Sequence, residues 1–140
     1  MKNKAPLSLM EQLIMLLVFA LSAALCLQIY VLSNQISRRC EIRGQAVTVV
    51  QNAAESVKYC KGDISQYQRL LGGSGDPEQW NIGYDVNWKT CLPDQACYHL
   101  RIIPERTSLP TLARARVSAF TQSDEELFSV TVSWQEVLHE

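Results

Sequence analysis

The stretch from Gln12 to Ser37 contains no Asp, Glu, Lys, Arg or His and consists mostly of Leu, Ile, Val, Ala, Met and Phe. An α-helix rises about 1.5 Å per residue, so about 20 apolar residues cross the roughly 30 Å hydrocarbon core of a bilayer. Within that core there is no water to bond to, so the backbone must satisfy its own hydrogen bonds as a helix. The tract therefore predicts one membrane-spanning helix over residues 7–37, long enough to cross with some tilt.

A cleaved signal peptide or a lipoprotein signal would also be apolar, but this tract fits both less well than an anchor. Residues 20–24 offer small side chains at a plausible cleavage spacing, but the apolar run continues to Leu32, and Glu11 breaks the usual basic region before it. A lipoprotein site at Cys26 needs a small residue just before the cysteine, where Leu25 stands. We therefore expect the tract to be kept as an anchor.

Beyond the span, apolar residues recur with the period of a one-sided helix. Their spacing alternates between three and four positions, at Ile42, Ala46, Val50, Ala53, Val57, Cys60 and Ile64. No proline occurs between Pro6 and Pro77, and Gly44 weakens the pattern by only about 1 kcal/mol relative to alanine. We expect residues 38–71 to hold the amphipathic continuation of the membrane helix and a short second helix.

The residues after this helix predict where it ends and where the second helix begins. Gly62 suits the left-handed conformation of a helix C-cap. Asp63 suits the N-cap of the next helix, and Gln66 three residues later would complete a capping box. The glycine-rich segment 72–77 should end that helix as a loop. The expected buried side of the second helix consists of Ile64, Tyr67, Leu70 and Leu71.

Residues 72–140 change from helical spacing to alternation, which is typical of strands with one buried face. Four strands are expected, over residues 80–88, 98–102, 112–121 and 128–134. The links between them are short, so the strands should form an antiparallel meander. The expected inward residues are Trp80, Ile82, Tyr84, Val86, Trp88, Tyr98, Leu100, Ile102, Ala113, Ala115, Val117, Ala119, Phe128, Val130, Val132 and Trp134.

One apolar face of such a sheet needs a cover. The long apolar stripe available is the helical one from Ile42 to Cys60. We therefore predict an α+β fold, in which a long N-terminal helix packs on a four-stranded antiparallel sheet through its second, amphipathic half. In this arrangement Arg114 and Arg116 would lie on the solvated sheet face.

The chain carries no recognisable catalytic or cofactor motif. Its net charge of −1 and pI near 6.1 provide no basic field for nucleic acid. It has no phosphate-binding loop, no glycine-rich nucleotide motif and no carboxylate pair in a defined setting. His99 has no nucleophile or acid partner in view. We expect a protein that is not an enzyme and uses no cofactor, metal or evident small-molecule substrate.

Cys91 and Cys97 bracket a short loop between two expected strands. A loop of this size can bring two cysteines to disulfide distance, and the closed ring would add roughly 2–3 kcal/mol to stability in the chain-entropy model. The bond requires that the domain lie outside the cytoplasm. A zinc site is the alternative, but only His99 is close enough in sequence to add a ligand.

The span begins with seven residues from Leu7 to Leu13, Leu-Ser-Leu-Met-Glu-Gln-Leu. This run resembles the start of type IV pilins and type II secretion pseudopilins. In that family a similar run opens the mature chain, and Glu11 falls at the place of the family's glutamate. That glutamate is thought to pair with the N-terminal amine of a neighbouring subunit during assembly. The long half-buried helix followed by an antiparallel meander is also pilin-like.

The resemblance makes residues 1–6, with Lys2 and Lys4, similar to a short basic leader, and Leu7 the first residue after it. The family's leader peptidase cuts after a small residue, usually glycine, where this chain has Pro6. Proline has a fixed φ and no N–H, which argues against cleavage at this bond.

Together these features favour a pilin-like or pseudopilin-like structural subunit, anchored in the cell membrane with a cytoplasmic N-terminus and an extracytoplasmic C-terminal domain. Its partners would be the membrane and other pilin-like subunits or envelope assembly proteins. Charge counting alone slightly favours the opposite orientation, because Arg38, Arg39 and Arg43 follow the span. The alternative is an independent single-pass anchored domain that binds or senses an extracytoplasmic ligand.

Overall fold

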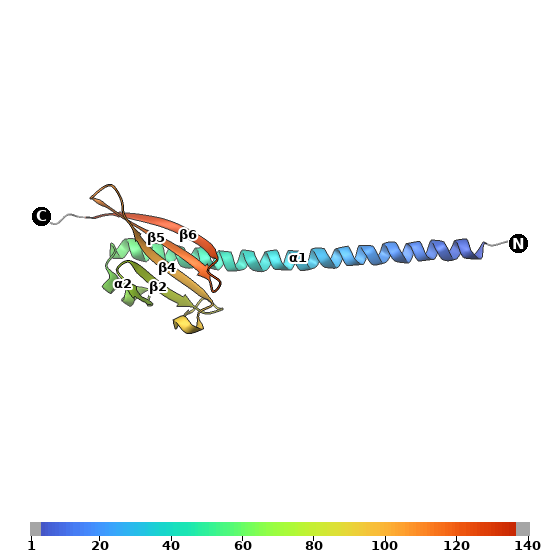
Figure 1. The fold of residues 1–140 in the computed structure, drawn as a ribbon, viewed down its shortest axis with the longest axis horizontal. Helices are drawn as coiled ribbons and strands as arrows, with labels where there is room; N and C mark the ends of the chain where they lie inside the picture. Colours follow the sequence, from blue (N-terminus) through green and yellow to red (C-terminus); the bar gives the residue numbers. More distant parts are fainter. Residues whose placement is uncertain (1–3, 137–140) are drawn as a thin grey trace. The chain divides into compact units, whose positions relative to one another are not determined.

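The computed structural model describes residues 4–136 and contains two helices, one 3₁₀ turn and six strands (Figure 1). These are α1 (Ala5–Cys60), α2 (Ile64–Leu70), β1 (Ser74–Asp76), β2 (Gln79–Tyr84), β3 (Thr90–Cys91), η1 (Pro93–Gln95), β4 (Tyr98–Glu105), β5 (Leu112–Thr121) and β6 (Glu126–Gln135). The chain divides into two compact units between Glu41 and Ile42, and α1 contributes residues to both. The predicted α+β class and the long N-terminal helix are confirmed.

Helix α1 runs without interruption through both the predicted span and the predicted amphipathic segment. Pro6 is its second residue, where a missing N–H removes no helical hydrogen bond. Gly44 does not break it, and a methyl group added there would meet nothing within 4 Å. One helix over both segments is therefore what the absence of an internal proline predicted.

The end of α1 lies where the glycine signal placed it. Lys61 and Gly62 both have positive φ, at 50° and 81°, and the Asp63 N–H donates to the Cys60 carbonyl at 3.0 Å. Gly62 is needed for a second reason, because a Cβ there would lie 3.0 Å from the Trp134 ring. The chain thus turns sharply from α1 into α2 at this point.

Helix α2 is capped by Asp63, whose carboxylate accepts from the Ser65 N–H at 3.0 Å. Gln66 donates its side-chain amide to the other oxygen of Asp63 at 3.1 Å, so the expected capping box is replaced by a side-chain pair. Tyr67 is buried as predicted, but Leu70 is 56% exposed. That prediction was wrong because Leu70 lies farther around the short helix than the face that Ile64 and Tyr67 share.

The sheet has six strands rather than four, in the order β1-β2-β4-β5-β6 with β3 also paired to β2. All neighbours are antiparallel, and β2, β4, β5 and β6 are the strands that the alternation predicted. The two short strands pair with the free edge of β2. The segment 72–77 was predicted as a loop, but it contains strand β1. Its glycines let the backbone of β1 lie close to that of β2, since a Cβ on Gly75 would overlap the Gln79 carbonyl oxygen.

The first predicted strand ends at Tyr84 and does not reach Trp88. Asp85 stops it, because its carboxylate accepts from the Asn87 and Lys89 N–H groups at 2.8 and 2.9 Å. Trp88 completes the turn with a positive φ of 60°. The alternation of residues 85–88 was therefore a coincidence of turn residues, and Val86 is exposed rather than inward-facing.

The core lies between the last third of α1 and one face of the sheet, as predicted (Figure 1). The helix contributes Ala46, Val50, Ala53, Ala54, Val57 and Cys60, all buried. The sheet contributes Trp80, Ile82, Tyr84, Leu100, Ile102, Ala115, Val117 and Ala119. Alanine recurs on both sides of this contact, so helix and sheet can approach closely. The inner residues of the edge strand β6 are only half-buried.

The opposite sheet face is polar, as expected for Arg114 and Arg116. Arg116 pairs with Glu105 at 2.7 Å across the β4–β5 ladder. Arg101 pairs with Asp124 at 2.7 Å and lies 4.6 Å from the centre of the Phe120 ring. These exposed pairs stabilise the fold only slightly, and the buried apolar face carries most of the stability.

Replacing Val50 by alanine should lower the free energy of unfolding by about 2 kcal/mol, because it removes fully buried carbons and leaves a cavity. The measurement is urea unfolding of the full chain in mild detergent, followed by tryptophan fluorescence. Val86→Ala is the matched control, because Val86 is 66% exposed, and it should change little. Equal effects of the two substitutions would contradict the described core.

Two glycines should respond to alanine in opposite directions. Gly44→Ala should raise stability by up to about 1 kcal/mol, because the site is helical and open. Gly83→Ala should lower stability, because its Cβ would lie 3.0 Å from the Ala96 Cβ and 3.1 Å from the Cys91 carbonyl oxygen. The same urea titrations compare the two, and a stabilised Gly83 variant would contradict this packing.

Candidate functional site

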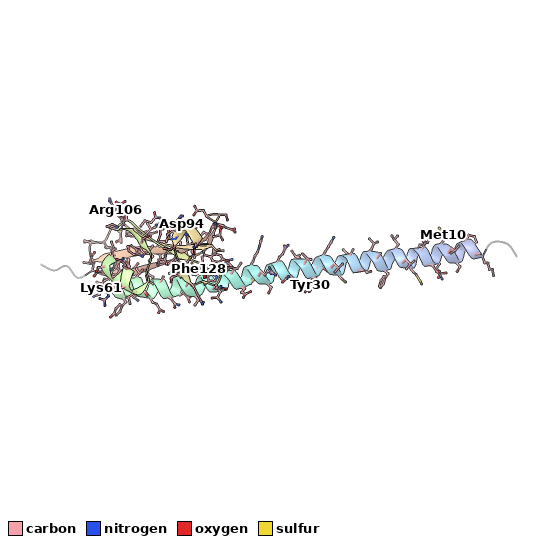
Figure 2. All side chains as sticks on the ribbon, turned by 90° about the horizontal axis from the view of Figure 1, so that it is seen from below. Met10, Tyr30, Lys61, Asp94, Arg106 and Phe128 are labelled. Carbon is pink, nitrogen blue, oxygen red and sulfur yellow. The ribbon has the colours of Figure 1, made fainter. Side chains whose placement is uncertain are left out.

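The apolar side chains of the first unit have no cover of their own. From Leu7 to Ile36 they project from α1 on every side, between 52% exposed at Val31 and 75% exposed at Phe19 (Figure 2). Water would disfavour so much exposed hydrocarbon, since full burial of one such side chain is worth about 1.5–3 kcal/mol. A single long apolar N-terminal helix of this kind is compatible with a membrane anchor.

Ser22, a polar residue inside this tract, is satisfied by the helix itself. Its hydroxyl donates to the Val18 carbonyl oxygen at 2.8 Å, one turn earlier. A serine bonded in this way presents no free donor to lipid. The backbone and this hydroxyl therefore suit a hydrocarbon environment.

Pro6, Leu7 and Glu11, which the pilin resemblance singles out, lie in the first turns of α1. Lys4 lies just before the helix, and Lys2 falls outside the described residues. Pro6 and Leu7 form part of the first turn, and Glu11 is exposed about one turn later. Within residues 4–136 no ion pair joins Glu11 to Lys4. The glutamate is therefore available to a group on another molecule.

Cys91 and Cys97 are both half-buried free thiols in this structure. Cys91 pairs with Gly83 along one edge of β2, whereas the Cys97 N–H donates to the Tyr84 carbonyl at 2.9 Å beside the β4 edge. The width of β2 thus separates the two backbones, and the segment from Leu92 to Ala96 passes over Gly83. The disulfide stays a prediction.

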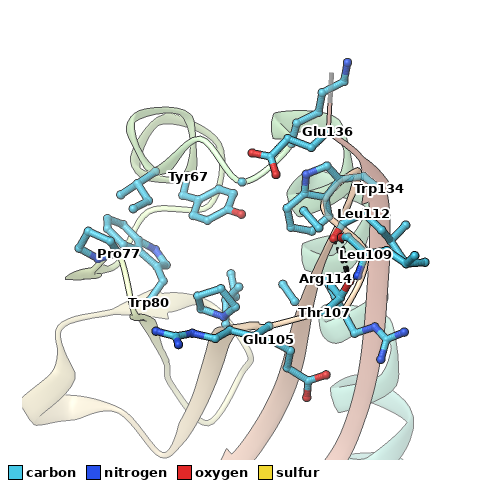
Figure 3. A pocket seen from close by; sticks show the side chains of 18 of the residues that line it. Tyr67, Pro77, Trp80, Glu105, Thr107, Leu109, Leu112, Arg114, Trp134 and Glu136 are labelled. Carbon is cyan, nitrogen blue, oxygen red and sulfur yellow. Dashed lines mark hydrogen bonds between the residues drawn. The ribbon is translucent and has the colours of Figure 1, made fainter. Parts of the chain in front are cut away.

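The second unit contains a cleft of about 470 Å³ that the sequence did not indicate (Figure 3). Tyr67 and Trp80 line one side of it, and Trp134 and Leu112 line the other. The Tyr67 and Trp80 rings meet edge to face at 6.2 Å, and the Trp80 indole donates to the Gly72 carbonyl at 2.9 Å. These bonds hold the aromatic wall in place.

The rim and floor of the cleft come from the connection between β4 and β5. The Thr107 hydroxyl accepts from the Leu109 N–H at 3.1 Å and lies 3.2 Å from the Leu112 carbonyl oxygen, which orders this connection. Charges of both signs surround the opening: Lys61, Asp76, Glu105, Arg106, Arg114 and Glu136. Among residues 4–136, the indole N–H of Trp134 is a buried donor without a hydrogen-bond partner.

Tyr67 is the most perturbed titratable group of the cleft. Burial, with smaller contributions from Cys60 and Asp63, raises its pKa to about 12. Its hydroxyl points into the cleft (Figure 3). Burial also raises the pKa of the Cys60 thiol, and the hydrogen bonds from Ser65 lower that of Asp63. The cleft thus offers aromatic surface and a tyrosine hydroxyl that stays protonated at ordinary pH.

Sequence reasoning missed this cleft because its aromatic residues also fit an ordinary inward-facing strand pattern. Trp80 and Trp134 lie on strands that do not pair with each other, and the cleft exists only where α2 and the β4–β5 connection meet them. Pro104, near the end of β4, and Pro110, in the β4–β5 connection, each restrict the backbone and were the one available signal.

Comparison of the chain with family models, curated proteins and solved structures found no match. The pilin resemblance therefore depends on the seven-residue head and on the architecture alone.

Stability should fall as pH rises from about 10 to 12. A raised folded-state pKa means that the folded form holds the Tyr67 proton more tightly than the unfolded form does. The stability that this proton contributes is therefore complete below the unfolded-state pKa of 10 and is lost as pH rises through the folded-state pKa of about 12. Tyr67→Phe should flatten the alkaline part of the profile, measured by urea unfolding at several pH values. Tyr59→Phe is the control, because Tyr59 is 78% exposed, and an identical effect there would contradict this assignment.

Proposed function

We propose that this chain is a pilin-like or pseudopilin-like structural subunit of an envelope filament or secretion assembly. It is anchored in the cell membrane by residues 7–37, with a cytoplasmic N-terminus and an extracytoplasmic domain. One observation carries the proposal: a single helix, α1, is apolar and uncovered on all sides in its first half and buried under an antiparallel sheet in its last third.

The division of α1 explains how such a subunit would act. Its first half has no partner in its own unit, so in lipid its neighbours are acyl chains or the same kind of helix from other subunits. Its last third is fixed to the sheet through the buried stripe from Ala46 to Cys60, so each subunit would add one folded domain to the assembly.

Glu11 supplies the specific contact in this proposal. It is the only carboxylate between Met1 and Ile36, and it stands just ahead of the uncharged tract. A carboxylate at this place is costly to leave without a partner when helices pack around it. An amine or other cation on a neighbouring subunit would remove that cost and set the register between the two helices.

The cleft supports a second candidate function, an independent anchored domain that binds an extracytoplasmic ligand. Its two aromatic walls and the orphaned Trp134 donor are features of binding sites. The first proposal is preferred because the exposed helix and Glu11 have no role in a domain that acts alone beyond attaching it to the membrane.

The proposal is tested by crosslinking through a cysteine next to Glu11. In a variant with Gln12→Cys and both Cys26 and Cys40 replaced by alanine, oxidation of native membranes should join this chain to other pilin-like subunits. Glu11→Gln should lower the yield roughly tenfold, the scale of one charged hydrogen bond. Glu41→Gln, an exposed carboxylate on the same helix, is the control and should leave the yield unchanged.

Absence of any crosslink from a chain that resists alkaline extraction from membranes would exclude the assembly function and leave the anchored binding domain. Mass spectrometry of the native N-terminus completes the test. We expect the intact leader-like segment, because Pro6 occupies the cleavage position. A mature chain that begins at Leu7 would overturn that expectation while supporting the pilin-like assignment.

A further inference from the structure

Gln28 is a polar residue in the part of α1 that would be surrounded by lipid. It lies roughly 6 Å inside Leu32, where the apolar run ends. Side chains on a helix lean toward its N-terminus, so this amide leans away from the nearer end of the span and toward the bilayer interior. It is therefore poorly placed to reach water at the interface.

The Gln28 amide also lacks a partner within its own unit. It is exposed, and in the part of the chain that the structure describes no side-chain hydrogen bond joins it to any residue. Ser22 provides the contrast, since its hydroxyl is satisfied by the Val18 carbonyl at 2.8 Å. In hydrocarbon an unpaired amide is costly, so Gln28 requires a donor and an acceptor from another molecule.

The surroundings of Gln28 form one continuous helix face. Gln28 and Gln35 line a single shallow hollow together with Leu27, Val31 and Leu32. Their spacing of seven residues extends back to Leu21 and Ile14, and the intervening positions of the same seam are Leu17, Ala24 and Val31. Such a heptad pattern is the seam of a left-handed pair of helices, in which one polar position fixes register and partner number.

We propose that this face packs against the same face of a second copy of this chain. We call it the glutamine seam, and it consists of Ile14, Leu17, Leu21, Ala24, Gln28, Val31 and Gln35. The inference deepens the proposed function, on which it rests for the membrane-spanning role of residues 12–37. Copies inserted in the same direction form a parallel pair. A two-fold axis between them then brings each seam residue opposite its own counterpart.

The second copy is favoured by the chemistry of the amide itself. A glutamine side chain carries both a donor N–H₂ and an acceptor C=O, so two Gln28 side chains can each donate to the other. A different partner would need its own polar side chain at the same depth, whereas a second copy supplies one by symmetry. Gln35, one heptad farther along, can repeat the pairing nearer the interface.

The test is self-association of the full chain in phosphatidylcholine vesicles, measured by energy transfer between donor-labelled and acceptor-labelled C-terminal tags at increasing dilution in lipid. Gln28→Leu should raise the dissociation constant about threefold to thirtyfold, the range expected for hydrogen bonds between membrane helices. The substitution makes the span more apolar, so it does not impair insertion. Ser22→Ala is the matched control and should have no effect, because that hydroxyl bonds within its own helix.

Oxidative crosslinking locates the face independently. Leu21→Cys on the seam, with Cys26 and Cys40 replaced by alanine, should form a disulfide-linked dimer. A chain that keeps the natural Cys26, which lies on the opposite side of the helix, and has Cys40 replaced should not form this dimer. Unchanged association of Gln28→Leu, a monomeric wild-type chain, or equal crosslinking at both positions would overturn the inference. Crosslinks near Glu11 to other pilin-like subunits would still support the proposed function in those cases. A chain that leaves the membrane on alkaline extraction would contradict both the proposed function and the paired seam.

Discussion

The contact between one stripe of α1 and one face of the sheet is the interaction on which the second unit depends. The stripe from Ala46 to Cys60 is the cover for the inward residues of β2, β4 and β5, and those strands are the cover for the stripe. Neither surface could stay exposed to water without a large loss of hydrophobic free energy. Alanines are buried on both sides of the contact, where larger side chains would have to displace their neighbours.

The same helix meets two different requirements along its length. In residues 12–32 most side chains are apolar, and the unit offers them no protein cover. From Ile42 onward one side is apolar and the other polar, as a helix with a sheet on one side requires. Glu11, just ahead of this tract, and Gln28, within it, are polar residues with no side-chain partner among residues 4–136, which is why the proposals about partners concentrate on them.

Aromatic residues occupy both ends of the sheet and have different roles there. At one end Trp88 stacks on Tyr98 with ring centres 4.2 Å apart and fills the space beside the Asp85 turn. At the other end Tyr67, Trp80 and Trp134 do not close the gap between α2 and the β4–β5 connection, and the cleft results. Its opening carries charges of both signs, so the cleft favours no ligand by net charge alone.

The sequence by itself determined the elements whose periodicity is strong. Helix α1, the cap at Asp63 and the four long strands follow from spacings of 3.6 and 2 residues and from glycine and proline positions, and the stripe on α1 was the one long apolar surface in the sequence that could cover the strands. Tertiary structure alone decided the rest. Strands β1 and β3 exist only because β2 has a free edge. Leu70 is exposed because it lies farther around α2 than the buried face, and residues 85–88 turn because the Asp85 carboxylate binds the backbone. The cleft depends likewise on segments distant in sequence, since local patterns specify which face of an element is apolar but not which other element lies against it.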